Sequence, residues 1–283
     1  MEQPVAVAVI IFQNIVRRYI LAPESSRKGT TMKLKALGCS GAEFPGHHTS
    51  SFLIDSSILL DAGTVGAVLD EDHQFALKSI FITHSHFDHI KGIPLLADNL
   101  ALSNQSHNVK LVSTPEILQV IRLHLMNNVI WPDFSRIPSF HSPVLSYVEI
   151  SPGKPYKTDG YTVTAYPVNH SVPAVGYIVR KGGKSLLYTG DTGPTDLIWE
   201  AAGELSALIV EVSLPDRMGN MAALTGHMTP ALLLQELTKL GKRPRRILVT
   251  HLKPQYQEEI LTELELLKID GLEILTDGAA YDI

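Results

Sequence analysis

The chain has 283 residues, of which 45% are hydrophobic, so it can bury a large core as a single α/β domain. Its formal charge of −5, from 24 basic and 29 acidic residues, gives no general attraction to DNA and makes RNA a less expected partner. The single cysteine, Cys39, excludes an intramolecular disulfide and a cysteine-rich metal site. A small phosphorylated substrate fits this composition better than a nucleic acid.

The first 31 residues differ in pattern from the rest of the chain. The apolar stretch from Val5 to Phe12 is far shorter than the roughly 20 residues that span a bilayer. Glu2 is the only charge before this stretch, so the positive region of a signal peptide is missing. We expect an N-terminal extension of unknown role at residues 1–31, a functional domain at residues 32–283, no membrane partner and a cytoplasmic location.

From Met32 onward the hydrophobic pattern becomes regular. Residues 33–37 alternate as a strand, and residues 51–54 and 58–60 form an expected hairpin that ends at Asp61. A carboxylate at the end of a buried strand needs a partner. Asp61 is therefore expected either to orient a histidine that binds metal or to be satisfied by the turn that follows it.

The segment Thr83 to His89, with the sequence THSHFDH, follows an apolar run and is expected to be a loop that leaves a buried strand. Neighbouring side chains diverge from an extended backbone, so His84 and His86 can face one metal ion while Asp88 and His89 face another. The alternative is a surface loop without a ligand. The density of ligand-type side chains favours a site for two metal ions.

Beyond this loop, a strand is followed by a helix that is expected to start at Thr114-Pro115. His124 shares the apolar face of that helix and is expected to be a core residue rather than a ligand. The segment 127–134 then breaks the helical period and combines Asn128 and Trp131 with a proline. It suits a loop that covers a pocket, with ordinary packing of Trp131 as the alternative.

In the second half, ligand-type residues follow several expected strands. These strands are residues 161–166, 175–179, 186–188, 207–210 and 247–250. His170 follows the first strand, Asp191 the third and His251 the last, while Glu211 follows the fourth and has no assigned role. Because chain ends converge on one rim of a sheet, these side chains are expected to lie together.

A last helix is expected at residues 231–240, with Thr229 as its cap and a glycine at its end. His227 stands just before this helix. The charge run Lys242-Arg243-Pro244-Arg245-Arg246 follows the helix. We interpret this run as a solvated turn, with steering of phosphate as the alternative.

Together, the loop and the later residues resemble the ligand motifs of the metallo-β-lactamase superfamily. The residues that carry this resemblance are His84, His86, Asp88, His89, His170, Asp191 and His251. The resemblance covers residues 32–283 and implies an αββα sandwich with a binuclear metal centre. Zinc is the usual ion of imidazole-rich sites, and manganese or iron also suits nitrogen and carboxylate ligands.

The resemblance also implies how these ligands are divided. One ion would be bound by His84, His86 and His170. The other ion would be bound by Asp88, His89 and His251, and Asp191 would bridge the two. His227 resembles the accessory histidine of tRNase Z and its relatives, which implies a general acid for the departing alkoxide or a group that orients Asp88.

Two segments resemble the class II cyclic-nucleotide phosphodiesterases within this superfamily: residues 169–177 (NHSVPAVGY) and residues 128–134 (NVIWPDF). Phe87 stands where that branch usually has leucine. The resemblance implies that cyclic AMP or cyclic GMP is hydrolysed to the 5′-monophosphate by a water shared between two cations. The base is expected to lie against residues 124–134, where Trp131 would stack on it, Asn128 would bond to its edge and His124 would line the site.

Three other functions remain as alternatives. A tRNase Z-like RNA phosphodiesterase shares the chemistry, although the sequence lacks the glycine-rich arm with which tRNase Z grips tRNA. A thioester hydrolase of the glyoxalase II kind shares the ligands but offers no reason for His227. A non-enzymatic scaffold is disfavoured because all seven ligand candidates are retained, and the sequence leaves a homodimer open.

Overall fold

The computed structural model describes residues 31–103 and 106–283. The chain divides into two units, Met1–Thr30 and Thr31–Ile283, and the fold presented below is that of the second unit. The expected N-terminal extension, apart from Thr31, lies outside the described residues. Its boundary and role therefore stay predictions.

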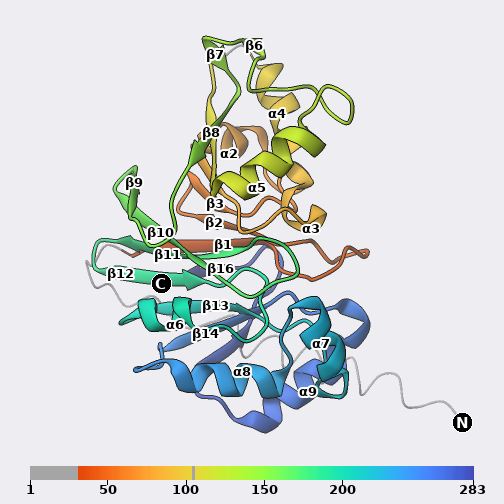
Figure 1. The fold of residues 1–283 in the computed structure, drawn as a ribbon, viewed down its shortest axis with the longest axis vertical. Coiled ribbons are helices and arrows are strands. Elements are labelled where there is room, and N and C mark those ends of the chain that lie inside the picture. The colour runs from red at the N-terminus through yellow and green to blue at the C-terminus, as the bar shows by residue number, and fades with distance from the viewer. Residues whose placement is uncertain (1–30, 104–105) are drawn as a thin grey trace, which may run out of the picture. The chain divides into compact units, whose positions relative to one another are not determined.

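Two seven-stranded sheets form the centre of the second unit (Figure 1). In sheet order, the first contains β16 (Ala280–Asp282), β1 (Lys33–Gly38), β2 (Ser51–Ile54), β3 (Ile58–Leu60), β4 (Ser79–Phe81), β5 (Val109–Ser113) and β8 (Leu145–Glu149). The second contains β15 (Leu272–Ile274), β14 (Arg246–Thr250), β13 (Ala207–Glu211), β12 (Lys184–Tyr188), β11 (Val175–Lys181), β10 (Tyr161–Pro167) and β9 (Tyr156–Thr158). A small hairpin is made by β6 (Pro138–Ser139) and β7 (Ser142–Pro143).

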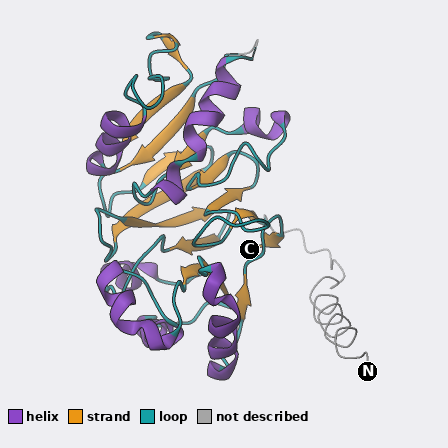
Figure 2. Ribbon diagram, turned by 90° about the vertical axis from the view of Figure 1, so that its right-hand side faces the viewer, coloured by secondary structure: helices purple, strands orange, loops and turns teal. Residues whose placement is uncertain are grey.

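Helices cover the outer faces of the two sheets (Figure 2). Those in the first half are α2 (Glu71–Ala76), α3 (Phe87–Ile90), α4 (Gly92–Ala101) and α5 (Pro115–Val120). Those in the second half are α6 (Leu197–Ala202), α7 (Gly219–Thr225), α8 (Pro230–Glu236) and α9 (Gln257–Leu267). This arrangement confirms the expected αββα sandwich. Among the described residues, every helix is too short or too polar to cross a membrane.

Alternation along the strands explains why two separate cores form. In β11 and β12, Tyr177 and Tyr188 belong to the core that includes the first sheet, whereas Ile178 and Leu187 belong to the core under α6, α8 and α9. Successive side chains of a strand point to opposite faces, so a strand that is apolar on both faces must be covered on both. The continuous apolar runs of the second sheet therefore require a layer on each side.

Aromatic pairs connect the two sheets across this interior. The rings of Phe52 in β2 and Tyr188 in β12 meet edge to face with their centroids 5.1 Å apart. Phe81 in β4 and Tyr177 in β11 form a similar pair at 5.5 Å. Such edge-to-face pairs stabilise a core beyond the burial of their area. These contacts hold the sheets together just below the strand ends that carry the histidines.

The expected strands are confirmed within one or two residues at their ends, and β11 and β12 turn at Gly182 and Gly183 as expected. The short edge strands β9, β15 and β16 were not predicted, nor was β8. The expectation that His124 is a core residue is wrong, because this side chain is exposed. The helix widens into a π-helical turn at Ile121–Leu125, with Met126 N bonded to Ile121 O, and this turn rotates His124 off the apolar face.

The contact between Phe52 and Tyr188 generates a prediction about stability. Phe52 is fully buried, so we expect Phe52→Ala to lower the free energy of unfolding by about 3–5 kcal/mol through the loss of apolar burial and the cavity left behind. Urea denaturation followed by circular dichroism measures this change. As a control, Phe140→Ala removes a ring that is 73% exposed and should change stability by less than about 0.5 kcal/mol. Equal losses in both variants would contradict the packing described here.

Candidate metal centre

The loop after β4 divides its ligand-type residues into two pairs through its backbone. His86 is extended, with φ −64° and ψ 145°, and forms the N-cap of α3. His84 therefore lies two residues before His86 on extended chain, while Asp88 and His89 lie inside the first turn of the helix. The sequence predicted two pairs on an extended loop, whereas here the change from extended chain to helix turns the second pair away from the first.

Four of the imidazoles are oriented in the same way. In each, Nδ1 is held by an oxygen, which leaves Nε2 to face the centre of the cluster. The pairs are His84 with Thr83 Oγ1 at 3.0 Å, His89 with Asp61 Oδ2 at 2.7 Å, His170 with Gly226 O at 2.8 Å and His251 with Ser213 Oγ at 2.9 Å. His86 differs, because its Nδ1 faces His170 Nε2 at 3.1 Å.

The possible ligand atoms form four overlapping groups, two of which include His227 and two of which divide the seven predicted ligands between them. In one group, an atom from each of three imidazoles lies within 4.8 Å of the others: His84, His86 and His170. The same limit holds for the second group, Asp88, His89, Asp191 and His251.

Asp191 lies between the two groups. One of its oxygens, Oδ1, is 3.3 Å from His89 Nε2, and the other, Oδ2, is 3.7 Å from His84 Nε2 and 3.3 Å from His251 Nε2. A carboxylate with its oxygens turned to both groups is suited to bridge two ions.

The chemistry of these atoms fits metal ions. His84 Nε2 is buried and has no hydrogen-bond partner, whereas buried polar atoms normally have one. His89 Nε2 and His251 Nε2 face each other at 3.3 Å, although a facing pair of ring nitrogens can share only one proton. Cations bound in the two groups would satisfy these lone pairs, and mixed imidazole and carboxylate ligands suit zinc, manganese or iron.

Burial and charge set the protonation of the cluster. Burial, together with the neighbouring His89, holds the pKa of His84 well below its ordinary value, so His84 is a neutral imidazole. Burial opposes ionisation of Asp191, but His251 and His89 hold its pKa well below the usual range. Burial also disfavours a charge on His89, yet Asp191 and Asp61 raise its pKa well above the ordinary value. A cation that binds here must displace the His89 proton.

Asp61 supports the cluster from beneath. Its carboxylate accepts hydrogen bonds from the Thr83 backbone N–H and hydroxyl and from the Tyr188 hydroxyl, each at 2.8 Å, and it also contacts His89 Nδ1. None of these partners belongs to the turn that follows Asp61, so the expectation of a carboxylate satisfied by its own turn is wrong. Asp61 instead orients the ring of His89.

A second buried carboxylate, Glu211, supports His227. Glu211 Oε1 lies 2.7 Å from His227 Nδ1 and also accepts the Thr192 N–H, while Oε2 accepts the Ser213 hydroxyl at 2.7 Å. Burial lowers the pKa of His227, but the carboxylates of Glu211 and Asp191 raise it, and the net shift is upward. The ring of His227 stacks on His251 at 5.5 Å between centroids.

Sequence reasoning left Glu211 without a role. Its position at the end of a buried strand, equivalent to that of Asp61, was the available signal. The interpretation of His227 as a group that orients Asp88 is not supported, because no hydrogen bond joins the two residues in the described structure.

Backbone constraints hold two of these residues in place. Asp61 and His251 have φ values of +55° and +65°, a region that non-glycine residues rarely occupy without a functional reason. Gly63 allows the loop to approach closely, because a Cβ at this position would lie 1.9 Å from Asp88 O. The chain is thus folded tightly around the cluster.

The expected base-binding residues lie in a separate segment. Asn128 is exposed and its Oδ1 accepts the Asp133 N–H at 3.0 Å, whereas Trp131 is partly buried and packs against the core. Within residues 31–103 and 106–283, no hydrogen bond or ion pair joins residues 124–134 to the cluster. Their part in binding stays a prediction.

The fold agrees with comparisons to known proteins. Residues 57–252 match the β-lactamase superfamily domain, and the chain belongs to this superfamily. A protein of Yersinia pestis named probable 3′,5′-cyclic-nucleotide phosphodiesterase is 26% identical over 89% of this chain and 88% of its own length.

A second relative and a solved structure are also similar to this chain. Ribonuclease Z of Methanosarcina acetivorans is 22% identical over 65% of this chain and 73% of its own length. The unliganded crystal structure of yeast PDE1 has the same fold, with a TM-score of 0.75, 19% identity and coverage of 88% of this chain and 99% of that one.

The position of Asp191 between the two groups predicts a loss of metal binding on its removal. We expect Asp191→Ala to weaken zinc binding by more than the about 10–100-fold that the loss of an outer partner costs, because it removes a direct ligand. Competition with a chromophoric chelator measures this affinity. Asp191→Asn, which keeps the shape, should lose zinc as well, while Asp270→Ala at an exposed position should bind normally. Unchanged zinc affinity in both Asp191 variants would contradict this assignment.

Proposed function

We propose that this protein is a binuclear metal-dependent phosphodiesterase that hydrolyses 3′,5′-cyclic nucleotides, cyclic AMP or cyclic GMP, to 5′-nucleoside monophosphates. The observation that carries the proposal is the histidine–carboxylate pair of His227 and Glu211 beside the cluster of seven ligand-type residues. Ligands alone would serve any hydrolase of this superfamily. A histidine kept protonated by a buried carboxylate suits a reaction in which a poor leaving group must receive a proton.

The residues of the cluster divide their roles in this proposal. His84, His86 and His170 would hold one ion, Asp88, His89 and His251 would hold the other, and Asp191 would be shared by both. When bound, two divalent ions, zinc or alternatively manganese or iron, polarise the phosphoryl oxygens and lower the pKa of a water. Similarity to a relative named as a cyclic-nucleotide phosphodiesterase supports this substrate class.

Asp88 has a second role in the proposal, as the acceptor of a proton from the attacking water. Its side chain is 30% exposed, whereas that of Asp191 is only 3% exposed. Burial opposes ionisation of Asp88, but the hydrogen bond from His251 and the proximity of His89 hold its pKa well below the ordinary value. Asp88 is therefore an ionised carboxylate that solvent and substrate can reach.

His227 is the proposed general acid. Its Nδ1–H donates to Glu211, so Nε2 carries the proton that moves to the 3′ oxygen as the bond between phosphorus and that oxygen breaks. His227 then remains neutral, and its Nδ1–H still bonds to Glu211. The pair thus keeps the ring in one orientation before and after proton transfer.

The nucleoside part of the substrate is assigned to residues 124–134. Trp131 would stack on the base. Asn128 Oδ1 already accepts the Asp133 N–H, so Asn128 would bond to the edge of the base through its Nδ2 group. The exposed His124 would line the site. A small molecule is the proposed partner, without DNA or a membrane. A homodimer and a cytoplasmic location also stay predictions.

Cleavage of RNA is a second candidate function, because the chain is also similar to proteins named ribonuclease Z. Both candidates use the same bond chemistry and differ in the size of the leaving group. The thioester hydrolase and the scaffold are less well supported, because neither uses the pair of His227 and Glu211.

Hydrolysis assays with the zinc-loaded or manganese-loaded full chain separate these functions. We expect conversion of cyclic AMP or cyclic GMP to the 5′-monophosphate and hydrolysis of bis(p-nitrophenyl) phosphate, with both activities lost in Asp191→Ala. Cleavage of a tRNA precursor without action on cyclic nucleotides would replace the proposal by the RNA-cleaving function. Inactivity on every phosphodiester would reject both.

The proposed role of His227 predicts a dependence on the leaving group. His227→Asn should lower kcat for cyclic AMP by about 10²–10⁴-fold, because a departing alkoxide needs a proton. The loss should be much smaller for bis(p-nitrophenyl) phosphate, whose phenolate leaves without one. Steady-state kinetics of both substrates give this ratio, and Glu211→Gln should change it in the same direction.

The matched control for this experiment is His141→Asn, which changes an exposed histidine. It should leave both rates unchanged. Equal losses on the two substrates in His227→Asn would mean that His227 only supports the metal ligands.

A further inference from the structure

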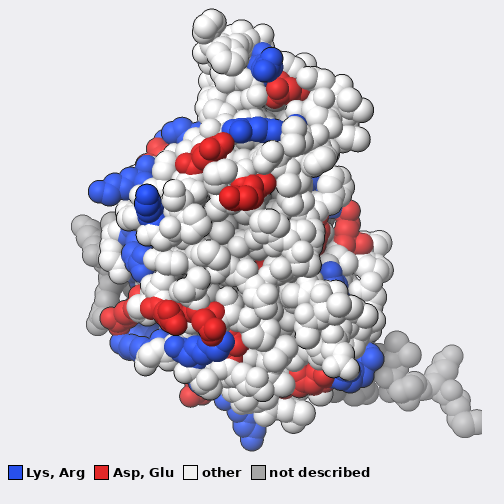
Figure 3. Space-filling view, in the orientation of Figure 1, with Lys and Arg blue, Asp and Glu red and all other residues white. Residues whose placement is uncertain are grey.

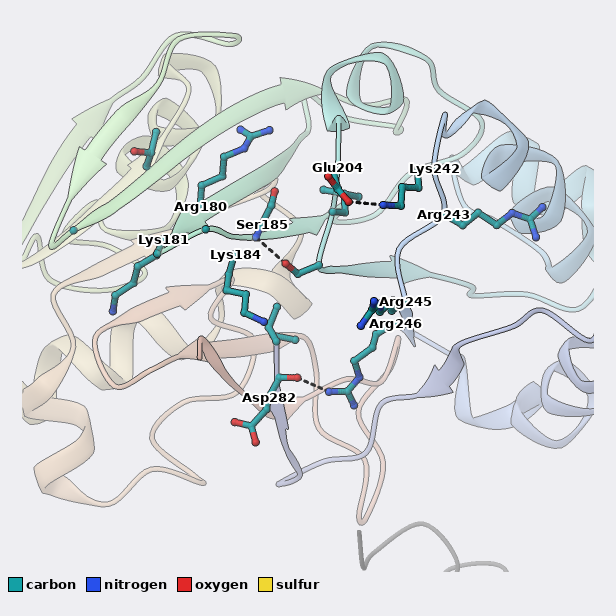
Figure 4. Close-up of a pocket in the computed structure, with 17 residues that line it drawn as sticks. Arg180, Lys181, Lys184, Ser185, Glu204, Lys242, Arg243, Arg245, Arg246 and Asp282 are labelled. Atoms are coloured by element: carbon teal, nitrogen blue, oxygen red, sulfur yellow. Dashed lines mark hydrogen bonds and ion pairs between the residues drawn. The ribbon is translucent and has the colours of Figure 1, made fainter. Parts of the chain in front are cut away.

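A hollow at the end of the second sheet lies outside the metal centre and contains a concentration of positive charge. Its cavity volume is about 900 Å³. It is lined by the turn between β11 and β12, the connection from α6 to β13 and the loop that leads into β14, together with residues at the start of β10 and the last residues, 282–283 (Figure 4). We call it the basic hollow. Seven of its lining residues are basic: Arg180, Lys181, Lys184, Lys242, Arg243, Arg245 and Arg246.

Only two acidic side chains, Glu204 and Asp282, line the same space. This excess contrasts with the formal charge of −5 for the whole chain. In the space-filling view, Lys and Arg side chains gather along the left edge, over the strands β9 to β12 (Figure 3). The positive charge is therefore a local feature that the net charge conceals.

Several of these cations have no carboxylate partner. Lys242 pairs with Glu204, Arg246 with Glu273 and Lys181 with Asp55, so these charges are already compensated.

The side chains of Lys184, Arg243 and Arg245, by contrast, make no hydrogen bond or ion pair within the described part of the chain. Arg180 makes a single long hydrogen bond, from Nη2 to Ala202 O at 3.4 Å. Four cations, two beside the turn between β11 and β12 and two on the loop that leads into β14, thus remain available to an anion.

A second observation also points to a ligand. Ser185 lines the basic hollow and is only 7% exposed, yet its hydroxyl has no hydrogen-bond partner. Buried hydroxyl groups normally have a partner. Uncompensated cations and an unpartnered hydroxyl can all donate hydrogen bonds, and phosphate oxygens can accept them.

The size and lining of the hollow define the class of ligand. A volume of about 900 Å³ is that of a small-molecule site rather than of an extended groove. No aromatic residue lines it, so it has no surface on which a nucleobase would stack. Recognition must therefore depend on charge, which favours a compact anion with several phosphate groups over a nucleic acid strand.

The basic hollow is separate from the metal centre. Lys184 and Arg246 begin the parallel-running strands β12 and β14, whereas Asp191 and His251 follow the ends of these same strands. Each strand has five residues, and a strand rises by about 3.3 Å per residue, so the two sites are at opposite ends of the sheet. The charge run 242–246 is thus not placed to steer phosphate into the metal centre.

We propose that the basic hollow is a second ligand site, which binds a compact polyphosphate anion through Arg180, Lys184, Arg243 and Arg245. A chain of two or three linked phosphate groups carries several negative charges along its length, so it can contact cations from both segments. A single phosphate would engage only some of them and should bind more weakly.

Titration calorimetry of the full chain with inorganic tripolyphosphate tests this proposal. Arg243→Gln combined with Arg245→Gln should weaken binding at least about tenfold, because two charge-assisted contacts are lost at exposed positions. The matched control, Arg136→Gln combined with Lys154→Gln, removes two exposed charges elsewhere and should bind like the unchanged protein. Inorganic phosphate should bind more weakly than tripolyphosphate.

Two further titrations make the outcome decisive. Asp191→Ala should retain tripolyphosphate binding, since the metal centre is not the proposed site. Loss of binding in Asp191→Ala, or equal affinity in the two double variants, would overturn the proposal. Tighter binding of a short RNA than of tripolyphosphate, with the same dependence on Arg243 and Arg245, would also overturn it by showing that the ligand is a nucleic acid.

Discussion

The carboxylate of Asp61 is the interaction on which the rest of the site depends. It is completely buried, and it is held at a positive φ by the end of a strand in the first sheet. Its partners are Thr83 at the start of the histidine loop, His89 within that loop and Tyr188 in the second sheet. One buried charge therefore fixes the loop, orients a ligand ring and ties both sheets together. A buried charge is costly unless every lone pair is used, and here several donors use them.

The strands and the histidine loop could be predicted from the sequence, because they depend on patterns among neighbouring residues. Alternation predicts the strands, and the spacing of His84, His86, Asp88 and His89 predicts two diverging pairs. The hydrogen-bond partners of the ligand residues could not be predicted in this way. The contact from His170 Nδ1 to Gly226 O joins residues 56 positions apart, and that from Tyr188 to Asp61 joins residues 127 apart. Hydrophobic periodicity contains no information about such pairings, which depend on how the sheets pack.

The π-helical turn before residue 126 illustrates a second limit. A sequence pattern assumes a regular period of 3.6 residues, and one extra residue per turn is enough to move His124 from the core to the surface. The role of Glu211 was hidden for another reason. Its strand predicted a buried carboxylate, but only the fold brings the loop with His227 to within 2.7 Å of it.

Charge is distributed unevenly between the metal centre and the basic hollow. Four carboxylates, Asp61, Asp88, Asp191 and Glu211, lie in or against the cluster at the ends of strands. Two divalent ions would offset these negative charges together with the side chain of His227, whose pKa is raised.

Attraction of a phosphate to the proposed centre therefore has to come from the ions at short range, and not from a broad positive field. The cations of the chain itself are concentrated at the strand beginnings. Because opposite ends of β12 and β14 carry the two kinds of site, an anion in the basic hollow does not compete for the metal ligands. A change at one site could reach the other only through the strands that they share.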